Sequence, residues 1–242
     1  MKIVAKTDVG MVRESNQDSY TTGELPNGVA WAVVCDGMGG AAGGNVASST
    51  AVKVIAEQIT SSFRPGMSAN SIKNMMVSAI NAANISVYDI SCSNSELYGM
   101  GTTVVCAIVM EHIAYIAHAG DSRAYIVSHG ALTQLTRDHS VVQELVEHGK
   151  ITAIEAKRHP NKNIITRAVG VSREILVDFS EQEMKDGDVL LLCTDGLTNF
   201  VESDEMCDLT KDDMFYEFAE RLVDRANKNG GGDNVTVVAV TY

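Results

Sequence analysis

Residues 29–44 constrain the fold of this chain most strongly, because they join an apolar strand to one acid and a glycine-rich loop. The apolar run 29–35 is typical of a strand that is buried on both faces. It ends at Asp36, and five of the next eight residues are glycine. A buried carboxylate needs a positive partner, while glycines let the backbone approach a ligand closely. Asp36 is therefore either a ligand or the N-cap of a following helix.

The composition argues against several classes of protein. With 242 residues, 45% of them hydrophobic, the chain can bury a substantial core. Its net charge is −12 and its basic residues form no cluster, so we expect no nucleic-acid partner and no anionic membrane contact. No N-terminal signal segment or membrane-spanning run is present. The five cysteines lack C-x-x-C spacing, which indicates reduced thiols in a cytoplasmic protein.

The pattern of apolar residues predicts strands and helices that do not alternate strictly. Three runs between residues 104 and 127 have tight links, which predicts an antiparallel meander and argues against a doubly wound sheet. Residues 136–168 are polar and helical only in pieces, so they form either a flap or a tolerated surface insertion. The expected strands are 2–7, 19–22, 29–35, 104–110, 112–118, 123–127, 132–135, 175–181, 188–193 and 235–242, and the expected helices are 45–63, one that begins at Ser68 or Ser71, and 212–228.

Five aspartates stand where predicted strands begin or end, so rigid elements could bring them together. They are Asp18, Asp36, Asp121, Asp195 and Asp233. Each one alone is typical of a turn. Two Asp-Gly steps directly after apolar strands, at Asp36 and Asp195, are hard to explain as turns only. Converging carboxylates without a histidine or cysteine ligand favour Mg²⁺ or Mn²⁺ over zinc.

The glycine loop also matches the pattern G-x-G-x-x-A, which opens a helix in dinucleotide-binding folds. The match begins at Gly37. Such folds place an acid about 20 residues further on, after a second parallel strand. Here Glu57 has that position, but it lies inside a predicted helix and no parallel strand follows. The pattern gives little support to a nucleotide site.

A series of short motifs runs through the chain from Arg13 to Asn234. They are Arg13-x-x-Asn16-Gln17-Asp18, Asp36-Gly37-Met38-Gly39-Gly40, Gly101-Thr102-Thr103, Gly120-Asp121-Ser122-Arg123, Asp138-His139-Ser140, Thr194-Asp195-Gly196-Leu197 and Asp233-Asn234. In content and order they resemble the metal-dependent type 2C (PPM) serine/threonine protein phosphatases, most closely the compact bacterial branch. One Asp-Gly step is a weak signal, whereas the full series is highly specific.

The resemblance implies one domain over residues 1–242 with an α+β fold. This fold is a four-layer α/β/β/α sandwich, in which helices flank two central antiparallel sheets, and residues 136–168 would be a flap beside the active site. It also implies two Mn²⁺ or Mg²⁺ ions at one end of the sheets. Asp36 would bridge the two ions, and the carbonyl of Gly37 would bind one of them. The other implied ligands are Asp195 and Asp233 for the second ion, Asp18 mainly through metal-bound water, and Asp121 with Asp195 for a third, weaker ion.

The resemblance implies hydrolysis of phosphoserine and phosphothreonine in proteins. Two metal ions can lower the pKa of a bridging water until hydroxide attacks phosphorus directly, without a phosphoenzyme intermediate. Arg13 would grip the substrate phosphate with two parallel hydrogen bonds, which lysine cannot reproduce. The expected setting is a cytoplasmic monomer that opposes a bacterial Ser/Thr kinase of the eukaryotic type.

The sequence leaves two questions open. Met38 stands where many eukaryotic members have a histidine that is proposed to protonate the leaving alcohol, and methionine cannot donate a proton. His118, His139 or a metal-bound water could take that role, and both histidines could instead be structural. The second question is how the fold is used. A pseudophosphatase that only binds, or a phosphatase for a regulatory protein in a partner-switching pathway, would share the fold, but no metal aspartate is missing.

Overall fold

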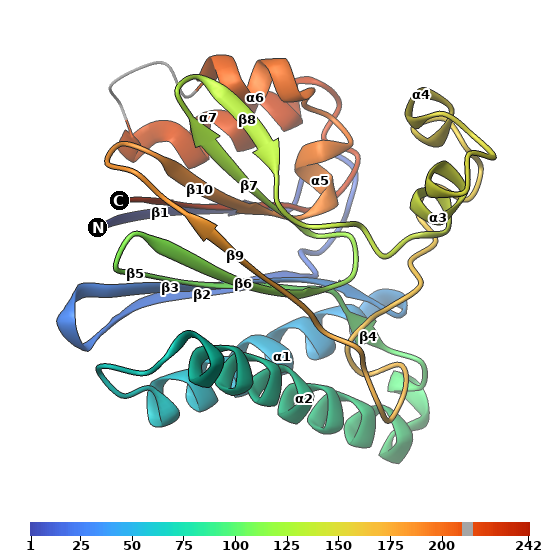
Figure 1. Ribbon diagram of the computed structural model, residues 1–242. Coiled ribbons are helices and arrows are strands. Elements are labelled where there is room, and N and C mark those ends of the chain that lie inside the picture. The colour runs from blue at the N-terminus through green and yellow to red at the C-terminus, as the bar shows by residue number, and fades with distance from the viewer. Residues whose placement is uncertain (210–214) are drawn as a thin grey trace.

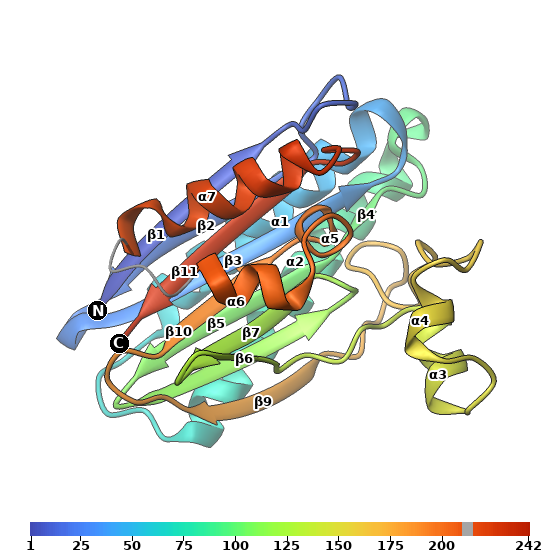
Figure 2. The same ribbon diagram turned by 90° about the horizontal axis from the view of Figure 1, so that it is seen from above.

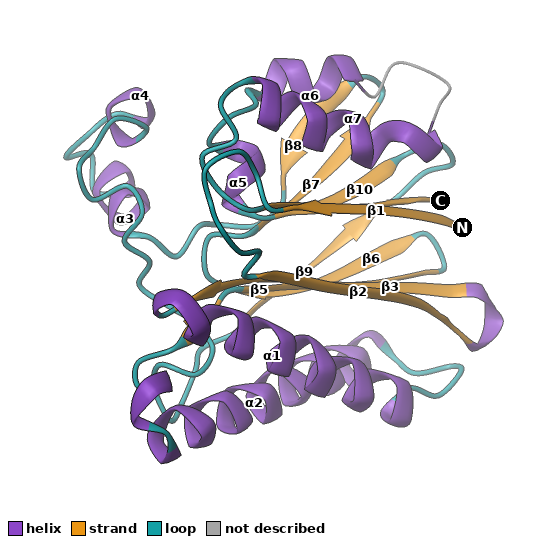
Figure 3. Cartoon of the chain, turned by 180° about the vertical axis from the view of Figure 1, so that it is seen from behind, coloured by secondary structure: helices purple, strands orange, loops and turns teal. Residues whose placement is uncertain are grey.

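Strand β3 (Val29–Met38) is buried on both faces as far as Cys35, as its apolar sequence predicts. Val33 and Cys35 pack toward helices, whereas Ala32 and Val34 face a second sheet, because successive side chains of a strand point to opposite faces. The computed structural model describes residues 1–209 and 215–242. They form a four-layer sandwich with two sheets between two layers of helices, which confirms the predicted fold (Figures 1 and 3).

Every strand pairing in the described part of the chain is antiparallel. One sheet consists, in spatial order, of β2 (Asp18–Leu25), β3, β5 (Val104–Met110), β6 (Ile113–Ala119) and β9 (Asp178–Glu183), with β4 (Gly101–Thr102) paired to β3. The other consists of β1 (Lys2–Asp8), β11 (Val235–Thr241), β10 (Val189–Cys193), β7 (Arg123–Ser128) and β8 (Ala131–Gln134). Their inner faces form an apolar core between the sheets.

Helices cover the outer faces of both sheets (Figure 3). Met75 and Met76 are core residues, as their helical spacing predicts. Ser68 caps the second long helix by accepting a hydrogen bond from the Ser71 N–H. The first sheet is covered by α1 (Gly40–Ser62) and α2 (Ala69–Ser93), the second by α5 (Asp195–Thr198), α6 (Ser203–Leu209) and α7 (Phe215–Lys228), and two short 3-10 helices are η1 (Pro26–Gly28) and η2 (Ser95–Leu97).

One prediction about the strand order is wrong. β5 and β6 form an antiparallel pair, but β7 pairs with β10 and β8 in the other sheet, so the three strands are not a meander. The chain crosses between the sheets at residues 120–122. A hairpin and a crossing need equally short links, so the spacing of the strands cannot distinguish them. The crossing places Asp121 between the two sheets.

Some element boundaries also differ from expectation. α1 begins at Gly40 instead of residue 45, because the glycines of its first turn allow close packing: a Cβ atom on Gly43 would lie 3.0 Å from the Cβ of Met100. β9 is shifted toward the C-terminus of its predicted range, and α6 was not predicted, since Met206 is its one buried residue. The predicted helix start at residue 212 lies outside the described residues.

Residues 136–168 project from one end of the sandwich and carry α3 (Val141–Glu147) and α4 (Ala153–Ala156) (Figures 1 and 2). The two ends of this segment lie together, because Ser140 forms a β-bridge with Ile165. The prediction of short helical pieces is confirmed. We call residues 136–168 the flap.

Two further findings bear on the composition. Among the described residues, no helix is both long and apolar enough to cross a membrane. The five cysteines, which all lie among the described residues, form no disulfide there, and Cys35, Cys106 and Cys193 are buried in strands.

Candidate metal centre and active site

Strands β2 and β3 bring the first two aspartates together. Their register places Asp18 directly opposite Asp36, and β3 ends on the side of the molecule that bears the flap (Figure 1). The backbone of Asp36 is fixed by Thr103, whose hydroxyl accepts a hydrogen bond from the Asp36 N–H (2.9 Å). The Thr103 N–H in turn donates to the Asp36 carbonyl (2.9 Å). The carboxylate therefore leaves a rigid strand end.

Both Asp-Gly steps are places where two backbone segments touch. A Cβ atom on Gly37 would lie 2.1 Å from a carbonyl oxygen in the first turn of α1. A Cβ atom on Gly196 would lie 1.9 Å from the carbonyl oxygen of Asn234. Neither distance is possible for a real side chain, so only glycine fits. At Gly196 this contact holds the start of α5, with Asp195, against the loop that carries Asp233.

Asp18 is buried, and one of its two carboxylate oxygens accepts hydrogen bonds from described residues. Its Oδ2 atom accepts hydrogen bonds from the hydroxyls of Thr194 (2.9 Å) and Thr236 (2.7 Å). Its Oδ1 atom is also buried and has no hydrogen-bond partner among the described residues. Burial raises the pKa of Asp18 to about 7. An oxygen left without a partner in the interior needs a further donor or a cation.

Arg13 and four of the five predicted aspartates line one cavity of about 650 Å³. Asp18 does not line this cavity. The charged residues that line it are Arg13, Glu14, Asp36, Asp121, Asp195 and Asp233, and further lining residues include Gly37, Met38, Asn163 and Ile165. The structure thus brings together residues that are separated by up to 220 positions in the sequence.

The carboxylates of this cavity oppose one another electrostatically. Burial, followed by the charges of Asp18 and Asp195, raises the pKa of Asp36 well above its ordinary value. Burial and the charge of Asp195 also raise the pKa of Asp121 to about 7. Arg13 is the cation that lines the cavity with them, and its Nη2 atom donates to Asp233 Oδ2 (2.8 Å). Among the described residues, one arginine does not balance the charge of the five acids that line the cavity.

A divalent cation fits this arrangement. The donor set is entirely carboxylate and carbonyl oxygen, which suits hard ions such as Mg²⁺ and Mn²⁺. The unpartnered Asp18 Oδ1 atom and the raised pKa values of Asp36 and Asp121 both indicate negative charge that lacks a counterion. Bound ions would offset that charge and return the carboxyls to their ionised forms.

Comparison with known proteins decides the family. The family model described as protein phosphatase 2C matches residues 12–236. The chain belongs to the protein phosphatase 2C family. It is 38% identical over 236 residues to the serine/threonine phosphatase stp of Listeria monocytogenes, which covers 97% of this chain and 93% of that relative.

Solved structures agree with this assignment. The serine/threonine phosphatase of S. agalactiae superimposes with a TM-score of 0.93 at 32% identity, over 100% of this chain and 99% of that one. The catalytic domain of the serine/threonine protein phosphatase PstP, in complex with two manganese ions, gives a TM-score of 0.85 at 33% identity, over 98% and 96% of the two chains. Phosphatases of this family thus use divalent metals.

Sequence reasoning missed the polar residues that hold the phosphatase 2C aspartates in place. Thr194 and Thr236 bind Asp18, and Thr103 binds Asp36. Thr194 and Thr103 belong to motifs quoted above, but a threonine beside an aspartate carries no local signal of which atom it will contact. Their partners depend on strand register, which brings residues distant in the sequence together.

The two histidines considered as acids lie away from this site. Neither His118 nor His139 lines the cavity, and both are buried against Asp178. Their position does not suit proton transfer to a leaving group in the cavity. Met38 does line it, but a thioether has no proton to give.

Proposed function

We propose that this chain is an active phosphatase that hydrolyses phosphoserine and phosphothreonine in proteins with the help of two Mn²⁺ or Mg²⁺ ions. The observation that carries the proposal is the convergence of Asp36, Asp121, Asp195 and Asp233 with Arg13 on one cavity. Family membership and the names of the bacterial relatives support the same reaction. A pseudophosphatase is disfavoured, because every expected acid is present at the cavity or directly behind it.

The proposed ligands follow from the positions of the oxygens. Asp36 would bridge two ions, the Gly37 carbonyl would bind one of them, and Asp195 with Asp233 would bind the other. Asp18 would contribute mainly through water, and Asp121 with Asp195 would form a third, weaker site. When bound, such ions activate water for direct attack on phosphorus and offset the charge of the phosphate.

Arg13 would bind the substrate phosphate. Its side chain is 55% exposed and reaches the cavity wall, so the guanidinium can leave Asp233 and turn toward a ligand. A guanidinium presents two parallel N–H groups that match two phosphate oxygens. On substrate binding, Arg13 would exchange the Asp233 carboxylate for the phosphate. The two parallel N–H groups of the guanidinium would then orient that phosphate.

The test is phosphate release from a phosphothreonine peptide with Mn²⁺. The wild type should turn the peptide over, and Arg13→Lys should lower kcat/KM about tenfold to a hundredfold, because lysine keeps the charge but loses one charge-assisted hydrogen bond. Arg64→Lys, on the exposed loop after α1, is the matched control and should behave as wild type. No turnover by the wild type with Mn²⁺ would refute the proposed function.

We also propose that residues 1–242 act as one domain whose flap contacts the protein part of the substrate. Asn163 and Ile165 of the flap line the main cavity, and a smaller cavity of about 300 Å³ lies between the flap and the sandwich. Replacing residues 153–162 by a short linker should lower hydrolysis of the phosphopeptide more than that of a small aryl phosphate. Equal losses on both substrates would argue against this role.

A cytoplasmic monomer that opposes a bacterial Ser/Thr kinase fits the bacterial relatives. The alternative substrate is one regulatory protein of a partner-switching pathway. Phosphoproteins that accumulate in a strain without this gene distinguish the two, since many kinase substrates should rise in the first case and one protein in the second.

A further inference from the structure

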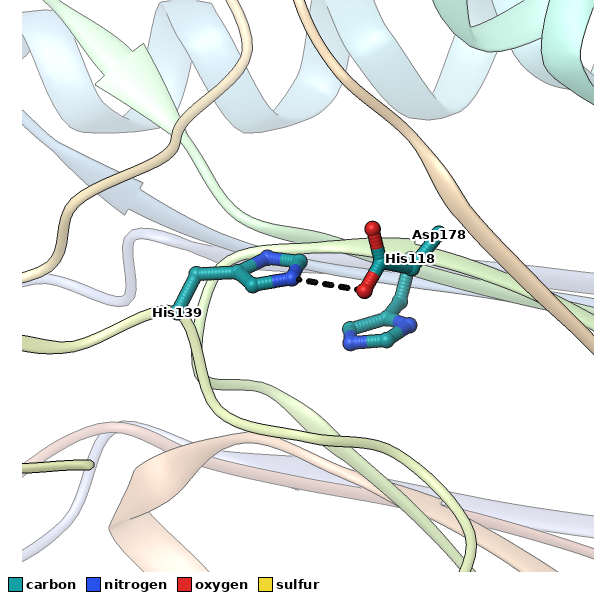
Figure 4. Close-up of side chains that lie close together, drawn as sticks. All are labelled: His118, His139 and Asp178. Atoms are coloured by element: carbon teal, nitrogen blue, oxygen red, sulfur yellow. Dashed lines mark hydrogen bonds and ion pairs between the residues drawn. The ribbon is translucent and has the colours of Figure 1, made fainter. Parts of the chain in front are cut away.

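A second group of titratable side chains lies outside the cavity. His118, His139 and Asp178 meet near the point where the chain crosses between the sheets, and we call them the histidine cluster (Figure 4). One potential ligand atom from each lies within 4.8 Å of the others, and the two rings stack with centroids 4.7 Å apart. Two histidines and one carboxylate have the composition of a zinc site.

Hydrogen bonds assign the ring protons and argue against a metal. The Gly120 N–H donates to Nδ1 of His139 (3.0 Å), so that nitrogen holds a lone pair and Nε2 carries the proton. This Nε2 faces Asp178 Oδ2 at 3.2 Å and donates to it. Nε2 of His118 lies 2.9 Å from the carbonyl oxygen of Arg137, which can only accept, so it too carries a proton. While they carry these protons, the two Nε2 atoms cannot bind a metal ion.

Charge within the histidine cluster is already balanced. Nη1 of Arg167 donates to Asp178 Oδ1 at 2.7 Å, so the carboxylate has a cation of its own. Burial lowers the pKa of both imidazoles, in keeping with neutral rings. The cluster is therefore a hydrogen-bonded assembly that orients the His139 ring, and its Nδ1 lone pair is directed at one backbone N–H.

That N–H belongs to the residue before Asp121. Gly120 is held twice by His139, since its carbonyl also accepts the His139 N–H (2.9 Å). Its φ of +117° is a conformation that favours glycine, and a Cβ atom there would lie 2.7 Å from the Thr103 side chain. Gly120 is thus fixed between Thr103, which also holds Asp36, and His139.

We infer that His139 is a positioning residue: its Nδ1 atom fixes the Gly120 peptide and thereby aims the Asp121 carboxylate at the metal centre. The inference rests on the proposed function, in which Asp121 is a metal ligand. Asp121 lies near the like charges of Asp195 and Asp138 and near the opposite charge of Arg123, so the direction of its carboxylate depends on how its backbone is held. A buried N–H that loses its acceptor would also drive the loop to rearrange.

A pair of substitutions separates the two ring nitrogens. In His139→Asn the amide oxygen can take the place of Nδ1 and accept the Gly120 N–H, while the link to Asp178 is lost. In His139→Gln the longer side chain can reach Asp178, while the acceptor for Gly120 is lost. Bound Mn²⁺ is counted from the electron paramagnetic resonance signal of the free ion, which reads binding without activity. Asp121→Asn identifies the ion that depends on Asp121.

His139→Gln should weaken the binding of that ion about tenfold, as loss of an outer-shell contact does, and should leave the other ions unchanged. His139→Asn should stay within about twofold of the wild type. The double variant His139→Gln/Asp121→Asn should bind Mn²⁺ as Asp121→Asn does, because both changes act on one ligand. Thermal unfolding in the presence of chelator should show that His139→Gln and His139→Asn are both folded.

Three results would overturn the inference. The two His139 variants could weaken Mn²⁺ binding equally, the double variant could bind less than Asp121→Asn, or an ion could be lost from His139→Asn alone, as a metal site in the histidine cluster requires. A wild type that binds no Mn²⁺ would instead overturn the proposed function, and the inference with it. The first three results need a wild type that binds Mn²⁺, so the two failures are distinguishable.

Discussion

Replacing Asp36 by asparagine should lower kcat for the phosphothreonine peptide on the order of a thousandfold or more, because the proposed bridging ligand is lost. The same change should stabilise the metal-free protein. Burial and the charges of Asp18 and Asp195 oppose ionisation of Asp36, and a neutral amide avoids this repulsion. We expect Tm in the presence of chelator to rise by about 2 °C or more. The substitution would then lower kcat with Mn²⁺ and raise the Tm of the metal-free protein.

The measurements are phosphate release with Mn²⁺ and thermal unfolding with chelator. Asp186→Asn is the matched control, since that side chain is 90% exposed and does not line the cavity. It should change neither quantity. An Asp36→Asn protein that keeps wild-type activity, or that unfolds at a lower temperature than the metal-free wild type, would contradict the assignment of Asp36 to a charged metal centre.

The carboxyls of the candidate metal centre should destabilise the metal-free protein increasingly as the pH rises from about 4 to about 7. Asp18 and Asp121 have ordinary pKa values of 3.8, which the folded protein raises to about 7. Between these values the two carboxyls bind more protons in the folded protein than in the unfolded chain, so their contribution to the free energy of unfolding falls as pH increases. The carboxyl groups of the candidate metal centre repel one another fully only when all of them are ionised.

Saturating Mn²⁺ should reverse this dependence, because it binds the ionised carboxylates and competes with protons. The stabilisation by Mn²⁺ should therefore be much larger at pH 8 than at pH 5. Thermal unfolding at both pH values, with Mn²⁺ and with chelator, measures it. Asp36→Asn should show a smaller pH dependence in chelator. A pH dependence in chelator that is as large in Asp36→Asn as in the wild type would contradict the account.

The family resemblance of the motifs predicted the four layers of the fold, and the structure brings four of the five predicted aspartates to one cavity. Burial of β3 on both faces follows from its apolar run over residues 29–35, and the amphipathic helices follow from their spacing. The aspartates could be found because each stands where a predicted strand begins or ends. Family resemblance then supplied the roles, which spacing alone could not.

The long-range contacts could not be predicted in the same way. The link at residues 120–122 is as short as a hairpin, so its crossing between sheets has no local signature. Thr236 binds Asp18 across 218 residues, and His139 binds Gly120 from the root of the flap. Such contacts depend on how the two sheets pack, which no single segment encodes.

The structure shows that the glycines of the glycine-rich loop also serve close packing. Its predicted use was to bring the Gly37 carbonyl to an ion. Gly37 and Gly43 also permit close contacts with α1 and Met100, and Gly39, with φ +119°, lies directly before α1. Packing alone therefore accounts for much of the glycine content, and metal binding at Gly37 remains a proposal.

The most direct test of the central claim is an Mn²⁺ titration in which bound ions and phosphate release are followed in the same sample. We predict that hydrolysis of the phosphothreonine peptide appears as two ions bind to each chain, disappears with chelator, and is absent from Asp36→Asn at every Mn²⁺ concentration. Hydrolysis that continues at the same rate after the ions have been removed would contradict a reaction that depends on this metal centre.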